Sequence, residues 1–576
     1  MQHLRLARIL DFFGVPWEAV EVSKLAEVQG KAQDHVVFGS APAVAAALNQ
    51  TPAVNHSVAR QAAFYVYTGE DRGASERALQ SLCENADLAL GHAPEGNLSL
   101  RVSRDLADLA GPMAGLEFSS RLRREDSVLL GAFGGEPGFA TIISAGGAPV
   151  FVRFEQSGIP VFLCTSSHVL DIDQVVGTGF YDVKDHFCSA VPLVMFVKTM
   201  FPEVGWRPQE LGACLIIDDP LLRQRYGFCD FGMLHSLMER YGFTTNIAFI
   251  PWNWRRTSSY AGEFFGNELG RFSVSIHGCD HIEAEFGETS AAVLNDRAKL
   301  AQSRMRNHEI RTGIHHDPVM IFPQGVFSSG CPEVLKRNGF LAAVNTEIVP
   351  VDSDNAGTRI SDVWDVAIMR YGSFPIFTRR YAHHGLENFA FDLLLGKPCL
   401  IVSHHEFFKG NCAELMELID KLQSLNCRLR WRPLGDIIRR ACRRRVKEEG
   451  LEEVEMYGNE LVIDNSSDQA TSVHVSKRES GTNFVTEVQC DQKPIMWTTM
   501  SERLIYDERI EPCSEKHFQV FYRDREEEEK VNRSLRYELS VAARRILSEF
   551  RDDFVSRSHF LSTTAAGLRS LLTTTN

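Results

Sequence analysis

Between about residue 211 and residue 440, short apolar runs alternate with segments whose apolar residues recur every three or four positions. The runs have the length of buried strands, and the periodic segments have the period of amphipathic helices. This alternation, with short turns, predicts a mostly parallel sheet or a (β/α) barrel. The expected strands are LGACLII (211–217), NIAFIP (246–251), FSVSIH (272–277), VMIFP (319–323), LAAVN (341–345) and PCLIVSHH (398–405).

The pattern differs on either side of this region. Residues 1–165 mix an amphipathic opening segment, an Ala-rich helix and several strand-like runs, which favours an α/β domain whose role the pattern does not indicate. Late in the chain, short β-type runs separated by polar turns predict an antiparallel, β-sandwich-like accessory domain. The expected division is 1–165 (α/β), 166–210 (connecting segment), 211–445 (barrel), 452–525 (β-sandwich-like) and 526–576 (helical tail).

Two charged runs and one apolar stripe mark the later part of the chain. A basic run at 439–447 and an acidic run at 448–455 are interpreted as a solvated helix end followed by a linker. In the tail, steps of three and four define a single apolar stripe, which we expect to pack on the protein itself rather than on a membrane. The stripe consists of Val531, Leu535, Leu539, Ala542, Ile546, Phe550 and Phe554.

Composition narrows the class of protein. The 576 residues include 61 Lys and Arg against 75 Asp and Glu, a formal net charge of −14. An acidic chain of this kind is not expected to be a dedicated nucleic-acid binder, which needs a basic face. No apolar run reaches the ~18 residues of a membrane span, and the N-terminal segment lacks the features of a signal peptide. The 13 scattered cysteines are typical of reduced thiols. We therefore expect a cytoplasmic protein; its oligomeric state is left open.

The candidate catalytic and metal-binding residues lie where the expected strands end. Asp218 and Asp219 end the first strand, and His277 and His281 stand four residues apart at the end of a later one. Functional groups of parallel α/β folds lie at the carboxyl ends of strands. Two imidazoles and one carboxylate suit zinc or another first-row metal, which leaves the second carboxylate to act as a base. The alternative is an N-capping aspartate beside an unrelated surface histidine pair.

Taken in order along the chain, these motifs resemble the polysaccharide deacetylase family, also known as the NodB homology domain or carbohydrate esterase family 4. IIDDP resembles the family's first motif and HGCDH its second. MIFPQGVFSS, followed by VLKRNGFLAAVNT, resembles the third, and LIVSHHEFF the last. The resemblance covers about 230 residues, 211–440. It implies a (β/α) barrel, distorted and with seven strands, that hydrolyses an N-acetyl group on an amino sugar.

The resemblance also implies a role for each matching residue. Asp218 would be the general base that deprotonates the attacking water, and His404 the general acid that protonates the leaving amine. His405 is the alternative for the acid. The implied ligands of the metal, expected to be zinc, are Asp219, His277 and His281.

The chain departs from the family pattern in three ways. The family's fourth motif, which contains Asp and Trp, is represented only by Asp362 and Trp364. Pro220 follows Asp219 where the family usually has glycine, and proline biases the preceding residue toward an extended backbone. Ile321 stands where the third motif usually carries the arginine that orients the base; Arg370, in IMRYGSF, is the candidate to replace it. The missing arginine motivates an alternative function: a catalytically lapsed deacetylase fold that serves carbohydrate binding or polysaccharide assembly.

The expected partner is a carbohydrate or an amino-sugar substrate. Trp252 and Trp254 follow a strand end, where their rings either stack on sugar rings or anchor the loop. The residues expected to contact substrate are Trp252, Trp254, Pro323 and Arg370.

Overall fold

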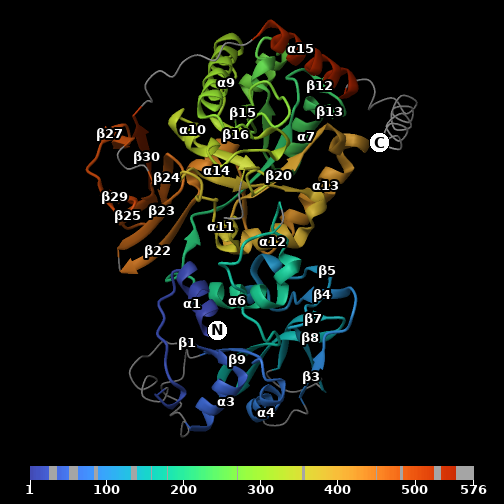
Figure 1. Ribbon diagram of the computed structural model, residues 1–576, viewed down its shortest axis with the longest axis vertical. Helices are drawn as coiled ribbons and strands as arrows, with labels where there is room; N and C mark the ends of the chain where they lie inside the picture. The colour runs from blue at the N-terminus through green and yellow to red at the C-terminus, as the bar shows by residue number, and fades with distance from the viewer. Residues whose placement is uncertain are drawn as a thin grey trace.

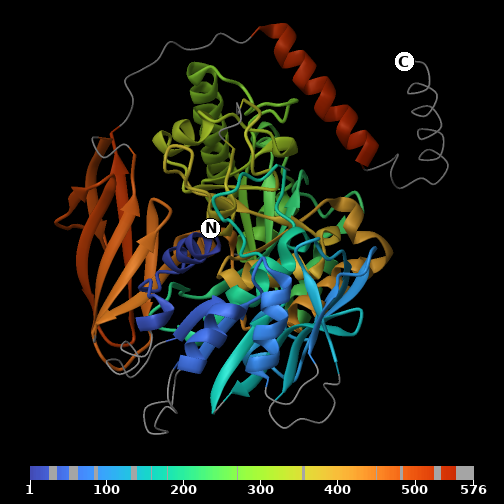
Figure 2. The same ribbon diagram turned by 60° about the horizontal axis from the view of Figure 1, so that its bottom comes forward.

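The computed structural model shows an N-terminal sheet, a parallel barrel, a pair of C-terminal sheets and one last helix (Figure 1). Figure 2 shows the paired sheets beside the barrel, with the N-terminal sheet on another side of it. The structure describes residues 1–24, 36–50, 63–83, 88–131, 139–156, 158–177, 179–268, 270–352, 357–448, 450–480, 484–523 and 534–552.

The central sheet confirms the predicted (β/α) barrel. Every pairing within it is parallel, and neighbours along the chain are neighbours in space from β11 to β20. The short strand β21 (Leu429–Trp431) adds to the beginning of β11. The barrel strands are β11 (Leu211–Asp218), β14 (Thr245–Phe249), β15 (Phe272–His277), β16 (Val319–Ile321), β17 (Ala342–Asn345), β18 (Ile376–Thr378), β19 (Arg380–Tyr381) and β20 (Cys399–Ser403).

One interrupted strand closes this barrel. β18 pairs with β17 on one side, and β19 pairs with β20 on the other. Only Arg379 separates β18 from β19, so these two occupy one position and the closed barrel has seven. The hydrophobic pattern did not predict this strand, because its residues 376–381 read IFTRRY and include two adjacent arginines.

The alternation of side chains along β11 places a carboxylate at one end of the barrel interior. Cys214 and Ile216 of β11 belong to a buried cluster with Ile321 and Val344 of the facing strands. Residues two apart on a strand share a face, so Asp218 continues this face at the carboxyl end of β11. The barrel therefore holds an apolar interior that ends in a carboxylate.

The helices around the barrel follow local signals in the sequence. Asp230 caps the first turn of α7 by accepting the Met233 amide, and Gly242 and Gly313 end α7 and α9 in left-handed conformation. The helices are α7 (Phe231–Tyr241), α8 (Ser259–Asn267), α9 (Ala291–Thr312), α10 (Cys331–Arg337), α11 (Ile360–Trp364), α12 (Leu386–Leu395), α13 (Lys409–Gln423) and α14 (Leu434–Arg440).

The N-terminal region forms a mixed sheet of order β1-β2-β9-β8-β7-β4-β5 and a separate β3–β6 ribbon. Its first two pairings are parallel and the others antiparallel. Its strands are β1 (Val36–Ser40), β2 (Ala63–Tyr67), β3 (Ala89–His92), β4 (Leu98–Val102), β5 (Glu117–Ser120), β6 (Ser127–Leu130), β7 (Ala140–Ala145), β8 (Ala148–Gln156) and β9 (Ile159–Cys164); its helices are α1 (Gln2–Phe12), α3 (Ala41–Gln50), α4 (Arg72–Leu82) and α5 (Ala107–Ala110).

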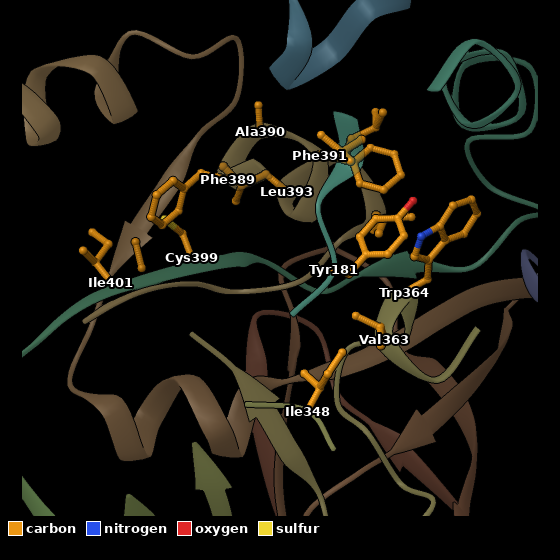
Figure 3. Close-up of a cluster of buried hydrophobic side chains, with 14 of the residues drawn as sticks. Tyr181, Ile348, Val363, Trp364, Phe389, Ala390, Phe391, Leu393, Cys399 and Ile401 are labelled. Carbon is orange, nitrogen blue, oxygen red and sulfur yellow. The ribbon is translucent and has the colours of Figure 1, made fainter. Parts of the chain in front are cut away.

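Residues 166–210, expected to connect two domains, pack as part of the core. They contain the buried helix α6 (Phe187–Met200). Tyr181 lies against Trp364 of α11 and Phe391 of α12, with ring centroids 6.5 and 6.3 Å apart (Figure 3). One continuous apolar cluster runs from the N-terminal sheet into the barrel. The two regions are therefore joined by packing as well as by the chain.

The C-terminal sheets enclose a buried apolar cluster that includes Val475, Tyr506 and Phe518. Most pairings are antiparallel, but β23 and β25 run parallel. The sheets have the orders β10-β22-β23-β25-β29-β28 and β24-β30-β26-β27. The strands are β10 (Arg207–Pro208), β22 (Cys442–Glu448), β23 (Leu451–Met456), β24 (Glu460–Asn465), β25 (Thr471–Arg478), β26 (Val485–Cys490), β27 (Lys493–Pro494), β28 (Thr498–Met500), β29 (Arg503–Ile510) and β30 (Ser514–Tyr522).

The interpretation of residues 439–455 as a helix end and linker is wrong. α14 ends at Arg440, and the basic and acidic runs then form β22 and β23, which pair antiparallel. Arg445 faces Glu453 across the ladder, with their side chains 2.6 Å apart. Opposite charges on adjacent strands stabilise the pairing. The charge runs are thus complementary halves of one hairpin.

Within the described residues, the predicted helical tail (526–576) contains the helix α15 (Leu535–Phe550). Two members of the predicted stripe, Val531 and Phe554, lie outside the described residues, as do residues 526–533 as a whole. Leu535, Leu539 and Ile546 face outward, 82%, 69% and 58% exposed, so the expectation that the stripe packs on the protein is wrong. Among the helices described, none is long and apolar enough to cross a membrane.

Candidate metal centre

Three side chains from two strand ends converge on one point. Asp219 follows β11, His277 ends β15, and His281 lies in the loop after it. Asp219 Oδ1 lies 3.3 Å from His277 Nε2 and 2.9 Å from His281 Nε2, and the two nitrogens are 3.1 Å apart. We call these three residues the Asp-His-His triangle. The sequence predicted all of its members.

The chemistry of these atoms fits a cation. His277 Nδ1 lies 3.0 Å from the Ile321 carbonyl oxygen, which can only accept, so Nδ1 carries the proton and Nε2 offers a lone pair. Asp219 Oδ1 is buried, and the described residues provide no hydrogen-bond donor for it. Ligands ~2.0–2.1 Å from a tetrahedral zinc lie about 3.3 Å apart, close to the edges of this triangle. A cation at the centre of the triangle would bind the Asp219 oxygen and the His277 lone pair, together with His281 Nε2 when that nitrogen is unprotonated.

The backbone at Asp219 is left-handed, with φ of 77°. The expectation that Pro220 holds this residue extended is therefore wrong. A residue other than glycine costs about 1–3 kcal/mol in such a region and persists only where surrounding contacts impose it. Here the sharp turn after β11 directs Asp219 toward the two histidines, while Asp218 stays on the barrel interior.

A second buried carboxylate lies beside the triangle. Asp218 is 4% exposed and accepts two hydrogen bonds from Arg379, Nη1 and Nη2 each 2.7 Å from one carboxylate oxygen. Burial raises the pKa of Asp218, but Arg379, ahead of His277 and His404, lowers it below its ordinary value. The carboxylate is therefore ionised over the neutral range.

Arg379, and not Arg370, pairs with Asp218. Arg370 lies 3.6 Å from Asp362, and Ile321 packs among apolar side chains of the barrel interior. The expectation for Arg370 as the replacement is wrong. The guanidinium instead comes from the interrupted strand that closes the barrel, on the other side of Asp218 in the strand order.

The two histidines after β20 have different surroundings. His404 is exposed, and it lies near enough to Asp218 to affect the pKa of that carboxyl. His405 is buried, stacked on Phe228 with ring centroids 5.9 Å apart, and its Nε2 lies 3.6 Å from Asp552. Only His404 is thus open to an incoming molecule.

Glu285, which the sequence did not single out, holds the loop that carries His281. Its buried carboxylate accepts the backbone amides of Cys279, Asp280 and His281 at 2.9, 2.8 and 3.0 Å. The only signal in the sequence is an acidic residue four positions after His281. Cys279, Asp280 and Glu285 could by position form a second ion site. Arg304 Nη1, 2.5 Å from Asp280, and these three amides already supply positive charge there.

Glu285→Gln is expected to weaken metal binding about 10–100-fold, the usual cost of losing support behind a ligand. An amide side chain keeps the volume but makes weaker hydrogen bonds to the three loop amides than a carboxylate does. Zinc titration of the apoprotein measures the change. Glu283→Gln, two residues away and exposed, is the matched control and should bind like wild type. Equal affinities in both variants would contradict a role for Glu285.

The residues expected to contact substrate are only partly accessible. Trp252 and Trp254 are half-buried, with the guanidinium carbons of Arg256 and Arg255 lying 5.6 and 4.4 Å from their ring centroids. Pro323 is buried next to Gly278, where an added Cβ would meet it. Pro323 thus packs under the loop that carries His281. The tryptophans each have one face covered by an arginine.

Figure 1 shows helix α15 beside the barrel, and side chains on or next to this helix contact loops at the carboxyl ends of the barrel strands. The Tyr226 hydroxyl donates to Asp552, just after α15, at 2.7 Å. Tyr537 donates to Asp280 at 2.8 Å, and Glu549 accepts from Arg256 Nη2 at 2.7 Å. Sequence reasoning could not find these contacts, because they join segments about 250–330 residues apart.

No protein-family model and no curated protein matches the chain. Similar solved structures include a putative polysaccharide deacetylase from Mycobacterium smegmatis, 12% identical with a TM-score of 0.27, covering 39% of this chain and 88% of that one. The chitin deacetylase of Colletotrichum lindemuthianum is 15% identical, with a TM-score of 0.26 over 40% of this chain and 88% of that one. A CE4 family pseudoenzyme from Bacillus anthracis is 11% identical, with a TM-score of 0.25 over 40% of this chain and 66% of that one. At these scores the likeness adds nothing on activity, so the case for a function depends on the geometry of the site.

Proposed function

We propose that the barrel is a metal-dependent hydrolase that removes an N-acetyl or related acyl group from an amino sugar or glycan precursor. The observation that carries the proposal is the Asp-His-His triangle beside a separate, ionised and buried carboxylate. A divalent cation in the triangle, in our proposal zinc, would polarise an acyl carbonyl and lower the pKa of a water molecule.

The protein's own groups supply the proton transfers. Asp218 accepts a proton from the attacking water, and Arg379 fixes the orientation of its carboxylate by a bidentate contact. His404, exposed at the end of β20, donates a proton to the leaving amine. His405 is buried against Phe228 and Asp552, so we assign it a structural part.

Arg379 also weakens the case for a catalytically lapsed fold. That alternative was motivated by Ile321 in the place of an arginine. Since a guanidinium reaches Asp218 from another strand, the base keeps the partner that this isoleucine could not provide. Carbohydrate binding without turnover stays one outcome of the experiment that tests the proposal.

The test combines metal analysis with acetate release from N-acetylated chito-oligosaccharides. Wild-type protein is expected to bind one divalent ion per chain and to release acetate. His277→Ala and His281→Ala should each lower metal affinity by more than ~100-fold and abolish release, because each removes one of three ligands. His315→Ala is the control, since His315 is a 78% exposed histidine outside the triangle.

Three outcomes separate the hypotheses. Wild-type protein that stays free of metal after zinc addition would contradict the metal site itself. Bound metal and bound oligosaccharide without acetate release would favour the lapsed fold. Release that is unchanged in both histidine variants would place the chemistry elsewhere.

A further inference from the structure

Helix α15 is fixed to the barrel by polar contacts on one face. Tyr537 reaches Asp280, and Glu549 pairs with Arg256. Val541 and Arg545 on the same helix are 1% and 6% exposed. The helix therefore has a defined inner face, and its outer face is held in a fixed orientation.

The outer face is apolar. Leu535, Leu539, Ile546 and Leu547 are each 58% to 82% exposed. At 100° per residue, Leu535, Leu539 and Ile546 lie within about 40° of one another, and Leu547 extends the same surface. Large apolar side chains gathered on one exposed face mark an interaction surface. We call these four residues the outer apolar face.

The exposed charges of α15 are all positive. Arg536 and Arg544 are exposed on the helix, and Arg551 is exposed just after it. The two glutamates of the helix, Glu538 and Glu549, are both half-buried. Within the described residues 534–552, the exposed charged side chains are thus all arginines, although the chain as a whole carries a net charge of −14.

We propose that α15 docks on an anionic lipid surface through its outer apolar face. A helix with leucines and isoleucine on one side and arginines beside them has the composition of helices that lie in the plane of a membrane interface. The arginines complement acidic headgroups. Because the inner face contacts the loops at the carboxyl ends of the barrel strands, docking would bring the metal centre close to the lipid surface.

The size of the surface argues against a second copy of this chain as the occupant. A helix of 16 residues is about 24 Å long and ~10–12 Å wide, which offers roughly 300 Å² on its outer face. A stable protein interface buries about 800 Å² per partner. A membrane needs no more than a row of inserted side chains.

Co-sedimentation of the full-length protein with vesicles tests this inference, and it does not depend on hydrolase activity. The protein is expected to bind phosphatidylcholine vesicles that contain phosphatidylglycerol, more weakly as salt rises, and to bind pure phosphatidylcholine poorly. Leu539→Gln/Ile546→Gln should weaken binding by more than 10-fold. Arg536→Gln/Arg544→Gln should weaken it on the order of 10–30-fold.

The matched controls change exposed residues of the same type elsewhere. Ile310→Gln on α9 replaces an 85% exposed isoleucine, and Arg509→Gln replaces a 70% exposed arginine. Both should bind like wild type. Failure of the wild type to bind anionic vesicles, or equal binding by all variants, would overturn the proposal. So would a dimer seen by ultracentrifugation that Leu539→Gln/Ile546→Gln dissociates while vesicles stay unbound.

Discussion

Asp218→Asn is expected to lower kcat for acyl hydrolysis by about 10²–10⁴-fold, the usual contribution of a positioned base, while metal stays bound. An amide of the same shape cannot accept the proton of the attacking water at neutral pH. The Asp-His-His triangle keeps all three of its ligand atoms, because Asp218 is not among them. Acetate release and zinc content per chain, measured on the same preparation, check both halves.

Loss of stability is the main confounding effect, since Asp218→Asn leaves the Arg379 guanidinium buried without its counter-charge. Asp392→Asn is the matched control. Asp392 is buried and pairs with Arg380, which follows Arg379 in the chain. Arg380 Nε and Nη2 lie 2.5 and 3.1 Å from the two carboxylate oxygens of Asp392. Both variants should lose stability, but only Asp218→Asn should lose kcat. Equal losses of kcat would assign Asp218 a structural role.

The parts of this site that sequence could predict are those that local pattern specifies. Asp218, Asp219, His277 and His281 stand where apolar runs end, and parallel strands bring such ends together. Strand order follows chain order around the barrel, so no long-range knowledge was needed to place them at one edge. The pattern therefore predicted the barrel and a site made of these four residues, whereas the choice of Asp219 rather than Asp218 as the ligand came from the family resemblance.

The roles of Arg379 and Glu285 could not be predicted from the local sequence, because both depend on how the chain folds around them. Arg379 lies between two strands of three and two residues, too short and too polar for periodicity to detect. Its partner is 161 positions away. Glu285 accepts backbone amides, and the direction of these amides is set by the turn after β15. Backbone amides are present at every residue here, so the residue types do not indicate this contact.

Helix α15 shows a different limit. Its period of three and four correctly predicts a helix with one apolar face, but not the direction in which that face points. The polar side of the helix matches Asp280 and Arg256 on the barrel, so specific polar contacts oppose the usual rule that apolar faces turn inward. Which face is buried was decided by partners more than 250 residues away.

Arg379→Met is expected to destabilise the fold by about 3–5 kcal/mol, because it leaves the Asp218 carboxylate buried without its partner. Arg380→Met should cost a similar amount through Asp392, so denaturant unfolding alone does not distinguish them. The double variant Asp218→Asn/Arg379→Met should recover part of the stability, since no unpaired charge remains, and should stay inactive. No recovery would show that the two side chains are not energetically coupled.

The pH dependence of stability and of kcat/KM distinguishes Arg379→Met from Arg380→Met. Burial raises the pKa of Asp218, and Arg379 is the leading influence that holds it below its ordinary value. The wild-type pair therefore stabilises the fold above the ordinary carboxyl pKa of ~3.9 and loses that contribution only as pH falls through the lowered value. In Arg379→Met the pKa should rise above that of the unfolded chain, so stability declines as pH rises through it. Activity should respond in the same way. In the pH profile of kcat/KM, the acid limb should move to higher pH in Arg379→Met, because Asp218 then titrates at higher pH, and should stay in place in Arg380→Met. An unmoved limb in both would mean that the group titrating in the profile is not Asp218.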